Sequence, residues 1–301
     1  MGFGARLTAL VAARESQIVL GLDPDPARLW AEALEQAPAE GSPARRAAAA
    51  VRAHCAALID AAGPACVAVK PQLACFERLG ADGWSALQAT VDHARAGGLL
   101  VIADAKRGDI DVSASAYAQA LVGGTPTPFG EAPGLGADAF TANPLLGADA
   151  LQPFAAAARA ADAGIFVLVR TSNPGAADVE DLELAGGGSV WECLARIVAE
   201  LAEPGDGLSE IGAVVGATEP AHLARARELM PRTPFLLPGI GAQGGRVEDL
   251  APAFAAGRAG GLVSASRSIA RAHEATRGAS NPRDAARAEA ERLREVAWSL
   301  G

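Results

Sequence analysis

Carboxylates and an ammonium group alternate along one short stretch of the chain, residues 101–110. Asp104 directly follows an apolar run, Lys106 comes two residues later, and Asp109 comes three residues after that. Residues two apart in an extended chain point to the same side, so Asp104 and Lys106 can share one site. A solvated turn with a surface ion pair is the usual explanation of a lone Asp-x-Lys. The rest of the chain therefore has to decide whether this stretch is catalytic.

Other charged residues occupy similar places along the chain. The run 99–103 contains no polar residue, which is typical of a parallel strand buried on both faces. Asp104 would then lie at the carboxyl end of that strand, where α/β enzymes place their catalytic groups. Lys70 follows the apolar run 67–69, and Asp23 follows the strand-like run 17–22. If these groups converge, the lysines keep the aspartates ionised and the aspartates keep the lysines protonated.

Two later segments have the composition of a phosphate site. The stretch from Pro238 to Gly245 holds four glycines in eight residues, Gly244 among them. Such a loop lets backbone amides converge on an anion, and Gln243 adds a side-chain amide. Arg267 follows the last strand-like run and can bind a phosphate with two hydrogen bonds. A flexible turn is the alternative for the glycine loop alone, but Arg267 at the next strand end favours phosphate.

Eight apolar runs separated by helical stretches predict the architecture. The predicted strands span 17–22, 66–69, 99–103, 137–141, 165–169, 211–215, 234–237 and 261–264. A helix is expected from the cap Ser42 to about residue 62, with others at 80–96 and 112–121, whereas 123–136 has the composition of a long loop. This pattern predicts a single-domain (β/α)8 barrel over residues 1–301, with an N-terminal helix before the first strand and a C-terminal helix about 282–299. A doubly wound open sheet is the alternative.

Composition excludes several classes of protein. The chain has 301 residues, half of them hydrophobic, and a net charge of −9, which argues against binding nucleic acid. Its four cysteines form no Cys-x-x-Cys pair, so reduced and mostly buried thiols are expected. No metal site is predicted, since the histidines are scattered and there is no His-Glu-x-x-His. No signal peptide or membrane-spanning run is found, so we expect a cytoplasmic protein.

Six segments match one enzyme family when taken together. They are Gly21-Leu22-Asp23-Pro24, Val69-Lys70-Pro71-Gln72, Asp104-Ala105-Lys106-Arg107-Gly108-Asp109-Ile110, Thr171-Ser172-Asn173-Pro174-Gly175, Leu237-Pro238-Gly239-Ile240-Gly241-Ala242-Gln243-Gly244-Gly245 and Ser266-Arg267-Ser268-Ile269. On these motifs the chain resembles orotidine 5′-phosphate decarboxylase, which converts orotidine 5′-phosphate to UMP in pyrimidine synthesis. The form Lys-Arg-Gly-Asp-Ile, together with Thr-Ser-Asn-Pro-Gly, is similar to the longer bacterial subgroup. The resemblance covers nearly the whole chain.

The resemblance implies a catalytic role for four charged residues. Lys70, Asp104, Lys106 and Asp109 correspond to the charged tetrad of the family. Lys106 would donate a proton to C6 of the pyrimidine, and Asp104 would lie beside the departing carboxylate. Asp109 and Ile110 would be delivered from the partner subunit of a homodimer. The family uses neither a cofactor nor a metal.

The resemblance also implies the contacts that hold the substrate. Asp23 and Lys70 would bind the ribose hydroxyls, and Ser172 would contact the pyrimidine ring. Gln243 and Arg267 would bind the phosphate, and Pro238 and Gly244 would line the substrate site beside them. Ser113 stands where relatives usually have a threonine, and its hydroxyl would reach across the dimer.

Two other functions compete with this interpretation. One is a magnesium-dependent decarboxylase or aldolase of the same superfamily that acts on a sugar phosphate. Those enzymes share Asp-x-Lys-x-x-Asp but bind the metal through a glutamate on strand 2, where this chain has Lys70, which would repel a cation. The other is a non-catalytic nucleotide-binding barrel. The presence of both Asp104 and Lys106 argues against it, since a silent barrel needs neither.

Overall fold

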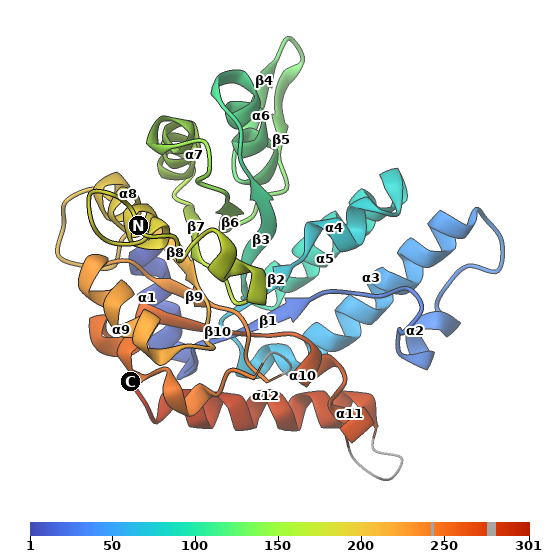
Figure 1. Cartoon of the computed structure of the whole chain (residues 1–301). Coiled ribbons are helices and arrows are strands. Elements are labelled where there is room, and N and C mark those ends of the chain that lie inside the picture. The colour runs from blue at the N-terminus through green and yellow to red at the C-terminus, as the bar shows by residue number, and fades with distance from the viewer. Residues whose placement is uncertain (242–243, 276–280) are drawn as a thin grey trace.

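Eight parallel strands close into a barrel. The computed structural model describes residues 1–241, 244–275 and 281–301 (Figure 1). The strands neighbour one another in the closed order β1-β10-β9-β8-β7-β6-β3-β2, and each of the eight pairs is parallel. They are β1 (Ile18–Leu22), β2 (Ala68–Pro71), β3 (Leu100–Arg107), β6 (Ala139–Ala142), β7 (Gly164–Arg170), β8 (Ile211–Val215), β9 (Phe235–Leu237) and β10 (Gly261–Ala265). The predicted (β/α)8 barrel is confirmed, and the doubly wound open sheet is wrong because the sheet closes on itself.

Helices surround the barrel and connect its strands. They are α1 (Phe3–Arg14), α2 (Ala31–Glu35), α3 (Pro43–Ala62), α4 (Leu73–Glu77), α5 (Gly80–Ala96), α6 (Asp111–Leu121), α7 (Ala148–Ala160), α8 (Val190–Leu201), α9 (Pro220–Leu229), α10 (Arg267–Ala270), α11 (Ala272–Ala275) and α12 (Pro282–Trp298). Short 3-10 turns occupy 63–65, 174–178, 247–249, 251–256 and 258–260. The last three replace a regular α-helix in the described part of the connection between β9 and β10.

Local capping explains where two of the predicted helices begin. The Ser42 side chain accepts a hydrogen bond from the Arg45 amide at 3.2 Å, and a proline follows it in the first turn of α3. The Asn281 side chain accepts from the Arg283 amide at 2.9 Å, again with a proline at the first helical position of α12. Each cap satisfies an amide that the helix itself leaves unpaired. The predicted starts of both helices are confirmed.

The stretch 123–136 is not the loop that its composition predicts. It contains an antiparallel hairpin, β4 (Gly124–Thr127) and β5 (Gly130–Pro133), which projects from the rim of the barrel (Figure 1). The Thr127 hydroxyl donates to the Gly130 carbonyl at 2.6 Å and accepts from the Phe129 amide at 3.1 Å. The prolines of this stretch favoured a loop in the prediction. A two-stranded hairpin nevertheless tolerates proline, because both of its strands are edge strands.

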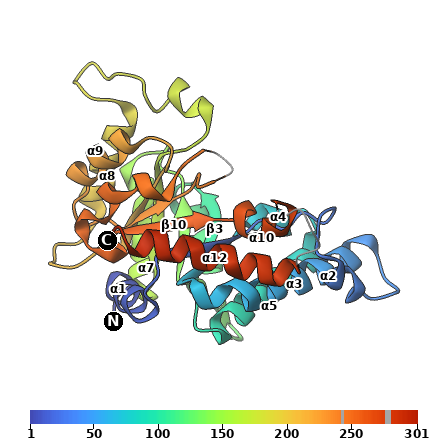
Figure 2. The same cartoon turned by 90° about the horizontal axis from the view of Figure 1, so that it is seen from below.

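The N-terminal helix closes one end of the barrel. Figure 2 shows α1 at the opposite end from the segment that follows β7. Phe3, Leu7 and Val11 of α1 pack in one cluster with a side chain from every barrel strand. Those strand residues are Val19, Ala68, Ile102, Ala139, Phe166, Val214, Leu236 and Leu262. The barrel interior is therefore a packed core at this end, which leaves the other end for function.

Two glycines make room for the aromatic rings of this core. A Cβ on Gly164 would lie 2.5 Å from the Phe3 ring, and a Cβ on Gly212 would lie 2.4 Å from the Phe166 ring. The two rings meet edge to face with centroids 6.0 Å apart. Two large rings fit inside the barrel because the strands beside them carry no side chain at these positions.

No helix within the described ranges has the length and apolar character needed to span a membrane. The cysteines at 55, 66, 75 and 193 are all free. Cys55 and Cys66 are buried, and burial raises the pKa of both thiols, that of Cys66 to about 12. These two side chains are therefore neutral, packed thiols.

Candidate active site

Strand periodicity places three polar side chains inside the barrel at its open end. Lys70 lies two residues after Ala68 of the interior cluster, and Asp104 lies two residues after Ile102. Thr141 has the same relation to residue 139 of β6. Because residues two apart share a face, all three side chains point into the barrel above the apolar core. All three are buried.

Asp104 is the centre of this group. Its Oδ2 accepts hydrogen bonds from Lys70 Nζ at 2.5 Å and from Gln72 Nε2 at 3.2 Å. Its Oδ1 accepts from Lys106 Nζ at 2.5 Å and from the Thr141 hydroxyl at 2.9 Å. The expected side-by-side placement of Asp104 and Lys106 is found here, with Lys70 on the other oxygen of the same carboxylate. The surface-turn alternative is wrong, since the carboxylate is 7% exposed.

The ammonium groups keep the buried carboxylate ionised. Burial alone would raise the pKa of Asp104, but the charges of Lys70 and Lys106 outweigh burial and lower that pKa to about 2. For Lys70 burial acts in the opposite sense, and the carboxylates of Asp104 and Asp23 outweigh it and raise the Lys70 pKa. Asp104 therefore carries its negative charge, and Lys70 its positive charge, throughout the neutral pH range.

The two lysines differ in their access to solvent. The Lys70 side chain is 8% exposed, whereas that of Lys106 is 45% exposed. β3 continues through Lys106 to Arg107, further than the predicted end at residue 103. Lys106 is therefore the more accessible of the two ammonium groups for a molecule bound at the barrel mouth.

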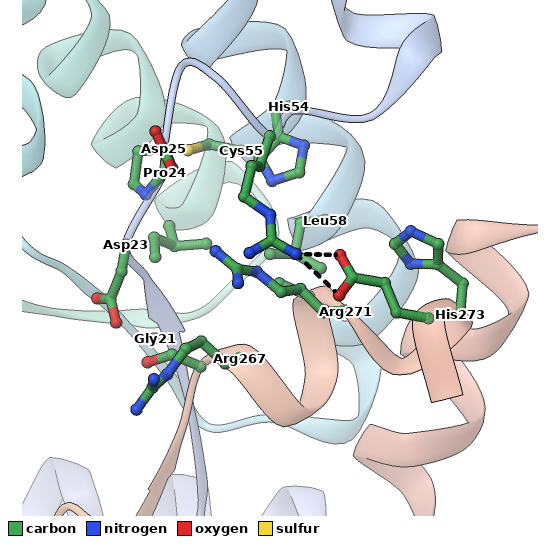
Figure 3. Close-up of a pocket in the computed structure, with 15 residues that line it drawn as sticks. Gly21, Asp23, Pro24, Asp25, His54, Cys55, Leu58, Arg267, Arg271 and His273 are labelled. Carbon is green, nitrogen blue, oxygen red and sulfur yellow. Dashed lines mark hydrogen bonds and ion pairs between the residues drawn. The ribbon is translucent and has the colours of Figure 1, made fainter. Parts of the chain in front are cut away.

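A pocket lies between the loop after β1 and the segment after β10 (Figure 3). Asp23 and Arg267 both line it, and their side chains extend to the same side in the figure. Arg28 and Glu274 form an ion pair at 3.1 Å across another part of the pocket. The structure thus brings the carboxylate predicted for ribose hydroxyls and the guanidinium predicted for phosphate to one opening.

The loop after β9 contains the other residues predicted to hold a phosphate. Pro238 is half-buried and Gly244 is exposed, with φ of +91° at Gly244. The amides of Gly241 and Gly244 donate to carbonyl oxygens within the loop, at 2.9 Å each. In this conformation these two amides do not converge on an anion. Gln243, the third residue predicted for this loop, lies outside the described residues.

Ser172 lies just after β7, beside the end of β8. It is half-buried and takes part in interactions with its surroundings. A Cβ on Gly216 would lie 3.0 Å from the Ser172 Cα, so the absence of a side chain at Gly216 allows this close approach. Ser172 therefore belongs to the same open end of the barrel as the lysines.

Three predicted residues lie apart from the charged cluster of their own chain. Asp109, Ile110 and Ser113 are at the start of α6, and the Asp109 carboxylate accepts from the Ile110 amide at 2.8 Å. In the part of the chain that the structure describes, no hydrogen bond or ion pair joins Asp109 to Asp104 or to either lysine. Ile110 is 51% exposed. A single chain thus assembles three members of the predicted tetrad and leaves the fourth at the surface.

Comparisons with known proteins agree with this geometry. The model of the orotidine 5′-phosphate decarboxylase / HUMPS family matches residues 16–287. Curated relatives named orotidine 5′-phosphate decarboxylase include those of Deinococcus radiodurans, 42% identical over 89% of this chain and 88% of the relative, and Haloarcula marismortui, 43% identical over 89% and 87%. The chain belongs to the orotidine 5′-phosphate decarboxylase family.

Solved structures extend the agreement to the fold of this family. OMP decarboxylase from Leishmania donovani superimposes with a TM-score of 0.72 at 33% identity, covering 99% of both chains. A structure from Streptomyces avermitilis gives a TM-score of 0.79 at 33% identity, covering 99% of this chain and 95% of the other. Neither the magnesium-dependent sugar-phosphate enzyme nor the silent nucleotide-binding barrel gains support from these comparisons. Among the described residues, no three His, Cys, Asp or Glu side chains are grouped so as to hold a metal ion.

Sequence reasoning missed two partners of Asp104 in this member of the family, Gln72 and Thr141. Gln72 stands in a quoted motif, and strand periodicity from Lys70 places it on the same face. Thr141 ends a predicted strand and lies two residues after the inward-facing residue 139, so it points to the same side. The amino-acid composition holds a second signal that was overlooked, the scarcity of lysine. Lys70 and Lys106 are the only lysines of the chain, and the other 24 basic residues are arginines. Both lysines contact one carboxylate.

Proposed function

We propose that this chain removes CO2 from orotidine 5′-phosphate to form UMP, as a carboxy-lyase that uses neither a metal nor an organic cofactor. The substrate is supported by family membership and by relatives of that name at up to 43% identity. The observation that carries the chemistry is the buried carboxylate of Asp104 between the ammonium groups of Lys70 and Lys106, each at 2.5 Å. This reaction completes the biosynthesis of UMP.

Lys106 is the proposed proton donor. Loss of CO2 from C6 leaves an electron pair in an sp2 orbital that the pyrimidine ring stabilises poorly. A fixed ammonium beside C6 stabilises that developing charge and then protonates the carbon. Two unit charges about 4 Å apart interact by about 4 kcal/mol at an effective dielectric constant near 20. This interaction corresponds to about three powers of ten in rate, so Lys106 supplies one part of the catalysis.

Asp104 is proposed to lie beside the carboxylate that leaves. Its pKa of about 2 in the unliganded chain means that it is ionised when the substrate arrives. Repulsion between two neighbouring carboxylates is relieved as CO2 departs, so this contact favours the transition state over the bound substrate. Lys70 donates to the other oxygen of the same carboxylate and so stabilises the ionised Asp104 inside the barrel.

The remaining predicted residues are proposed to bind the parts of the nucleotide that do not react. Asp23 and Lys70 bind the ribose hydroxyls, and Ser172 contacts the pyrimidine ring. The phosphate is bound at the loop after β9 and the start of α10, by Pro238, Gln243, Gly244 and Arg267. The shared opening of Asp23 and Arg267 supports this division, because it matches a ribose with its 5′-phosphate. Binding energy from the remote phosphate then helps to desolvate the charged cluster.

We also infer a homodimer in which the start of α6 completes the site of the partner. Asp109, Ile110 and Ser113 would reach the other subunit, as the family resemblance implies. Exposed apolar side chains support an interface here, since Val112 is 82% exposed and Leu145, before α7, is 80% exposed. Helices α6 and α7 pack against each other, so these residues belong to one region of the molecule.

We further propose that residues 1–301 act as one domain in the cytoplasm. α1 supports the single domain because it contributes side chains to the barrel core. The free cysteines support a reducing compartment, since a secreted protein of this kind would tend to pair exposed thiols. Cell fractionation with an antibody against the native protein tests the location.

The decisive experiment follows the ultraviolet absorbance of orotidine 5′-phosphate after addition of the purified protein, with EDTA present. Rapid loss of absorbance, unchanged by EDTA, is the expected result. Loss that requires added magnesium would point to the metal-dependent enzymes instead. UMP binding without any loss would leave a nucleotide-binding protein and refute the proposed activity.

A Lys106→Ala variant tests the assignment of the proton donor. It should abolish measurable turnover and still bind UMP, because the ribose and phosphate contacts remain. UMP affinity, measured by calorimetry, shows that the site is intact. Near-normal turnover in this variant would contradict the role of Lys106.

A further inference from the structure

The regular pairing of β3 with β6 is interrupted at the residues that are proposed to act on the substrate. Between two regularly paired positions, residues 104–106 of β3 lie opposite a single residue of β6, Thr141. Extra residues of this kind form a β-bulge, which re-aims side chains and is common beside active sites. Lys106 ends the insertion with φ of +48°, in the left-handed region that residues with a Cβ rarely adopt. The backbone at Lys106 therefore needs support from its neighbours.

The Thr141 hydroxyl supplies that support and fixes a direction of hydrogen bonding. The Lys106 amide donates to Thr141 Oγ1 at 2.9 Å. The same hydroxyl lies 2.9 Å from Asp104 Oδ1, and an ionised carboxylate can only accept, so the hydroxyl proton points to Asp104. Thr141 is 1% exposed, so solvent has almost no access to this hydroxyl. One side chain thus contacts both residues of the Asp-x-Lys pair.

These contacts close a ring around Lys106. Its backbone amide binds Thr141, Thr141 binds Asp104 Oδ1, and that oxygen accepts from Lys106 Nζ at 2.5 Å. Both ends of the lysine are therefore tied to the same carboxylate oxygen. The branched side chain of threonine restricts its own rotation about χ1, which keeps the hydroxyl between its two partners.

We propose that Thr141 is a positioning residue, which sets the Lys106 ammonium and the Asp104 carboxylate at the reacting carbon. This inference rests on the proposed function, in which Lys106 protonates C6. Thr141 acts through those two residues, whereas Asp23 and Arg267, which are proposed to hold the nucleotide, line a pocket to which Thr141 does not contribute. Loss of the hydroxyl should therefore lower kcat and leave KM and UMP affinity nearly unchanged.

The test compares four variants of the full chain with the wild type. Thr141→Val removes the hydroxyl and keeps the shape, Thr141→Ser keeps the hydroxyl, and Thr141→Ala differs from the serine variant by the hydroxyl alone. Thr90→Val is the matched control, because Thr90 is also 1% exposed and its hydroxyl donates to the Ala86 carbonyl within α5, away from the site. Steady-state kinetics with orotidine 5′-phosphate, UMP calorimetry and thermal unfolding are measured for each.

Thr141→Val should lower kcat by about 10- to 100-fold, the effect of losing hydrogen bonds to charged or catalytic groups. Its KM and UMP affinity should stay within about threefold of the wild type. Thr141→Ser should retain most of the activity, and the control Thr90→Val should match the wild type. If Thr141→Val does not fold, the serine and alanine variants test the same point. The kcat of Thr141→Ser should then exceed that of Thr141→Ala by about tenfold or more.

Three results would overturn the inference. A kcat of Thr141→Val equal to that of the wild type would show that the hydroxyl does not position the site. An equal loss of kcat in Thr141→Ser and Thr141→Ala would show that the methyl group of Thr141, and not its hydroxyl, is what matters. A rise in KM with unchanged kcat would place Thr141 in substrate binding. An inactive wild type would instead refute the proposed function, and this inference with it.

Discussion

Asp104 is the residue on which the charged cluster depends. Its two oxygens accept four hydrogen bonds, from Lys70, Gln72, Lys106 and Thr141. A buried charge is tolerated when its hydrogen bonds are satisfied, and it becomes costly when one partner is removed. Stability and catalysis therefore meet at this carboxylate, and they can be separated by substitution.

Asp104→Asn should destabilise the protein as well as abolish turnover. The substitution leaves the buried ammonium of Lys70 without its charge partner, which costs about 3 kcal/mol or more in the free energy of unfolding. Urea-induced unfolding at pH 7 measures this loss. Glu228→Gln is the control, since Glu228 forms an exposed ion pair with Arg225 and its loss should hardly move the midpoint. Equal stability of Asp104→Asn and the wild type would contradict the burial argument.

Acid should remove the contribution of ionised Asp104 to the free energy of unfolding of the wild type. The Asp104 pKa of about 2 lies below its unfolded value of about 3.9, so its stabilisation is complete above about pH 4 and is lost as the pH falls toward 2. The difference in unfolding free energy between wild type and Asp104→Asn should therefore narrow over this interval. A constant difference from pH 5 to pH 2 would show that the carboxylate is not stabilised by its neighbours.

Arg267→Ala should weaken the capture of substrate more than it slows the chemical step. Arg267 is exposed at the start of α10 and lines the same pocket as Asp23. Loss of a charge-assisted contact to phosphate should lower kcat/KM by about 10- to 100-fold. Arg246→Ala controls for net charge, because Arg246 is 69% exposed on the neighbouring loop and pairs with Glu248. Unchanged kcat/KM in Arg267→Ala would argue against a phosphate contact there.

Among the elements, one arginine of α9 links the segment before β9 to the connection between β9 and β10. Arg227 of α9 is buried and donates to the carbonyl oxygens of Met230, Thr233, Ala253 and Gly260 at 2.8–2.9 Å. Burial lowers the Arg227 pKa to about 10, so the group remains charged at neutral pH. The guanidinium thus satisfies two buried carbonyl oxygens before β9 and two in the connection between β9 and β10.

Arg227→Met should therefore destabilise the barrel. Four buried carbonyl oxygens would lose their donor, and each such loss costs about 1–3 kcal/mol, so the total should exceed about 3 kcal/mol. Chemical denaturation measures the change. Arg225→Met is the matched control two residues away on the same helix, because Arg225 makes only solvent-exposed contacts with Glu192 and Glu228. Similar midpoints for the two variants would show that Arg227 is not structural.

Most of the element pattern could be predicted from the sequence. The eight apolar runs give the eight barrel strands to within about two residues, except at the end of β3, which continues to Arg107, because buried parallel strands need continuous apolar sequence. The 3-10 turns between β9 and β10 could not be predicted, because two of their carbonyl oxygens are satisfied by Arg227, which reaches them from another element. The hairpin β4–β5 was missed because its strands are exposed and carry no apolar alternation.

The candidate site was predictable where its residues stand at strand ends. Their spacing of two residues placed Asp104 and Lys106 on one side of a strand, and the end of another predicted strand placed Lys70 at the same mouth of the barrel. Thr141 could not be assigned, because its role depends on a bulge that shifts β3 against β6. The position of Asp109 relative to a neighbouring subunit is beyond what one chain's periodicity specifies, and it stays a prediction.

For the whole molecule, the proposed dimer predicts that each active site contains residues of both subunits, which mixed dimers can test. Asp109→Ala and Lys106→Ala should each be inactive. In a mixture whose subunits exchange, each mixed dimer has one site with both defects and one intact site. About a quarter of the wild-type activity should return, since about half of randomly formed dimers are mixed.

The control is each variant exchanged with itself, which should remain inactive. Subunit exchange is verified by native mass spectrometry with one variant isotopically labelled. An inactive mixture that contains mixed dimers would show that Asp109 serves its own chain, and a monomeric protein would refute the shared site altogether.

The scarcity of lysine gives the molecule a built-in chemical label. Lys70 is buried, so Lys106 is the only lysine ammonium that solvent reaches freely. An amine-directed reagent such as an acylating ester therefore reacts at Lys106 and at the amino terminus. If the nucleotide binds as proposed, it covers that amine, and the mass gained at Lys106 then reports what fraction of the sites is empty. Occupancy of the site becomes a quantity that one peptide in a digest reveals, without any substrate being turned over.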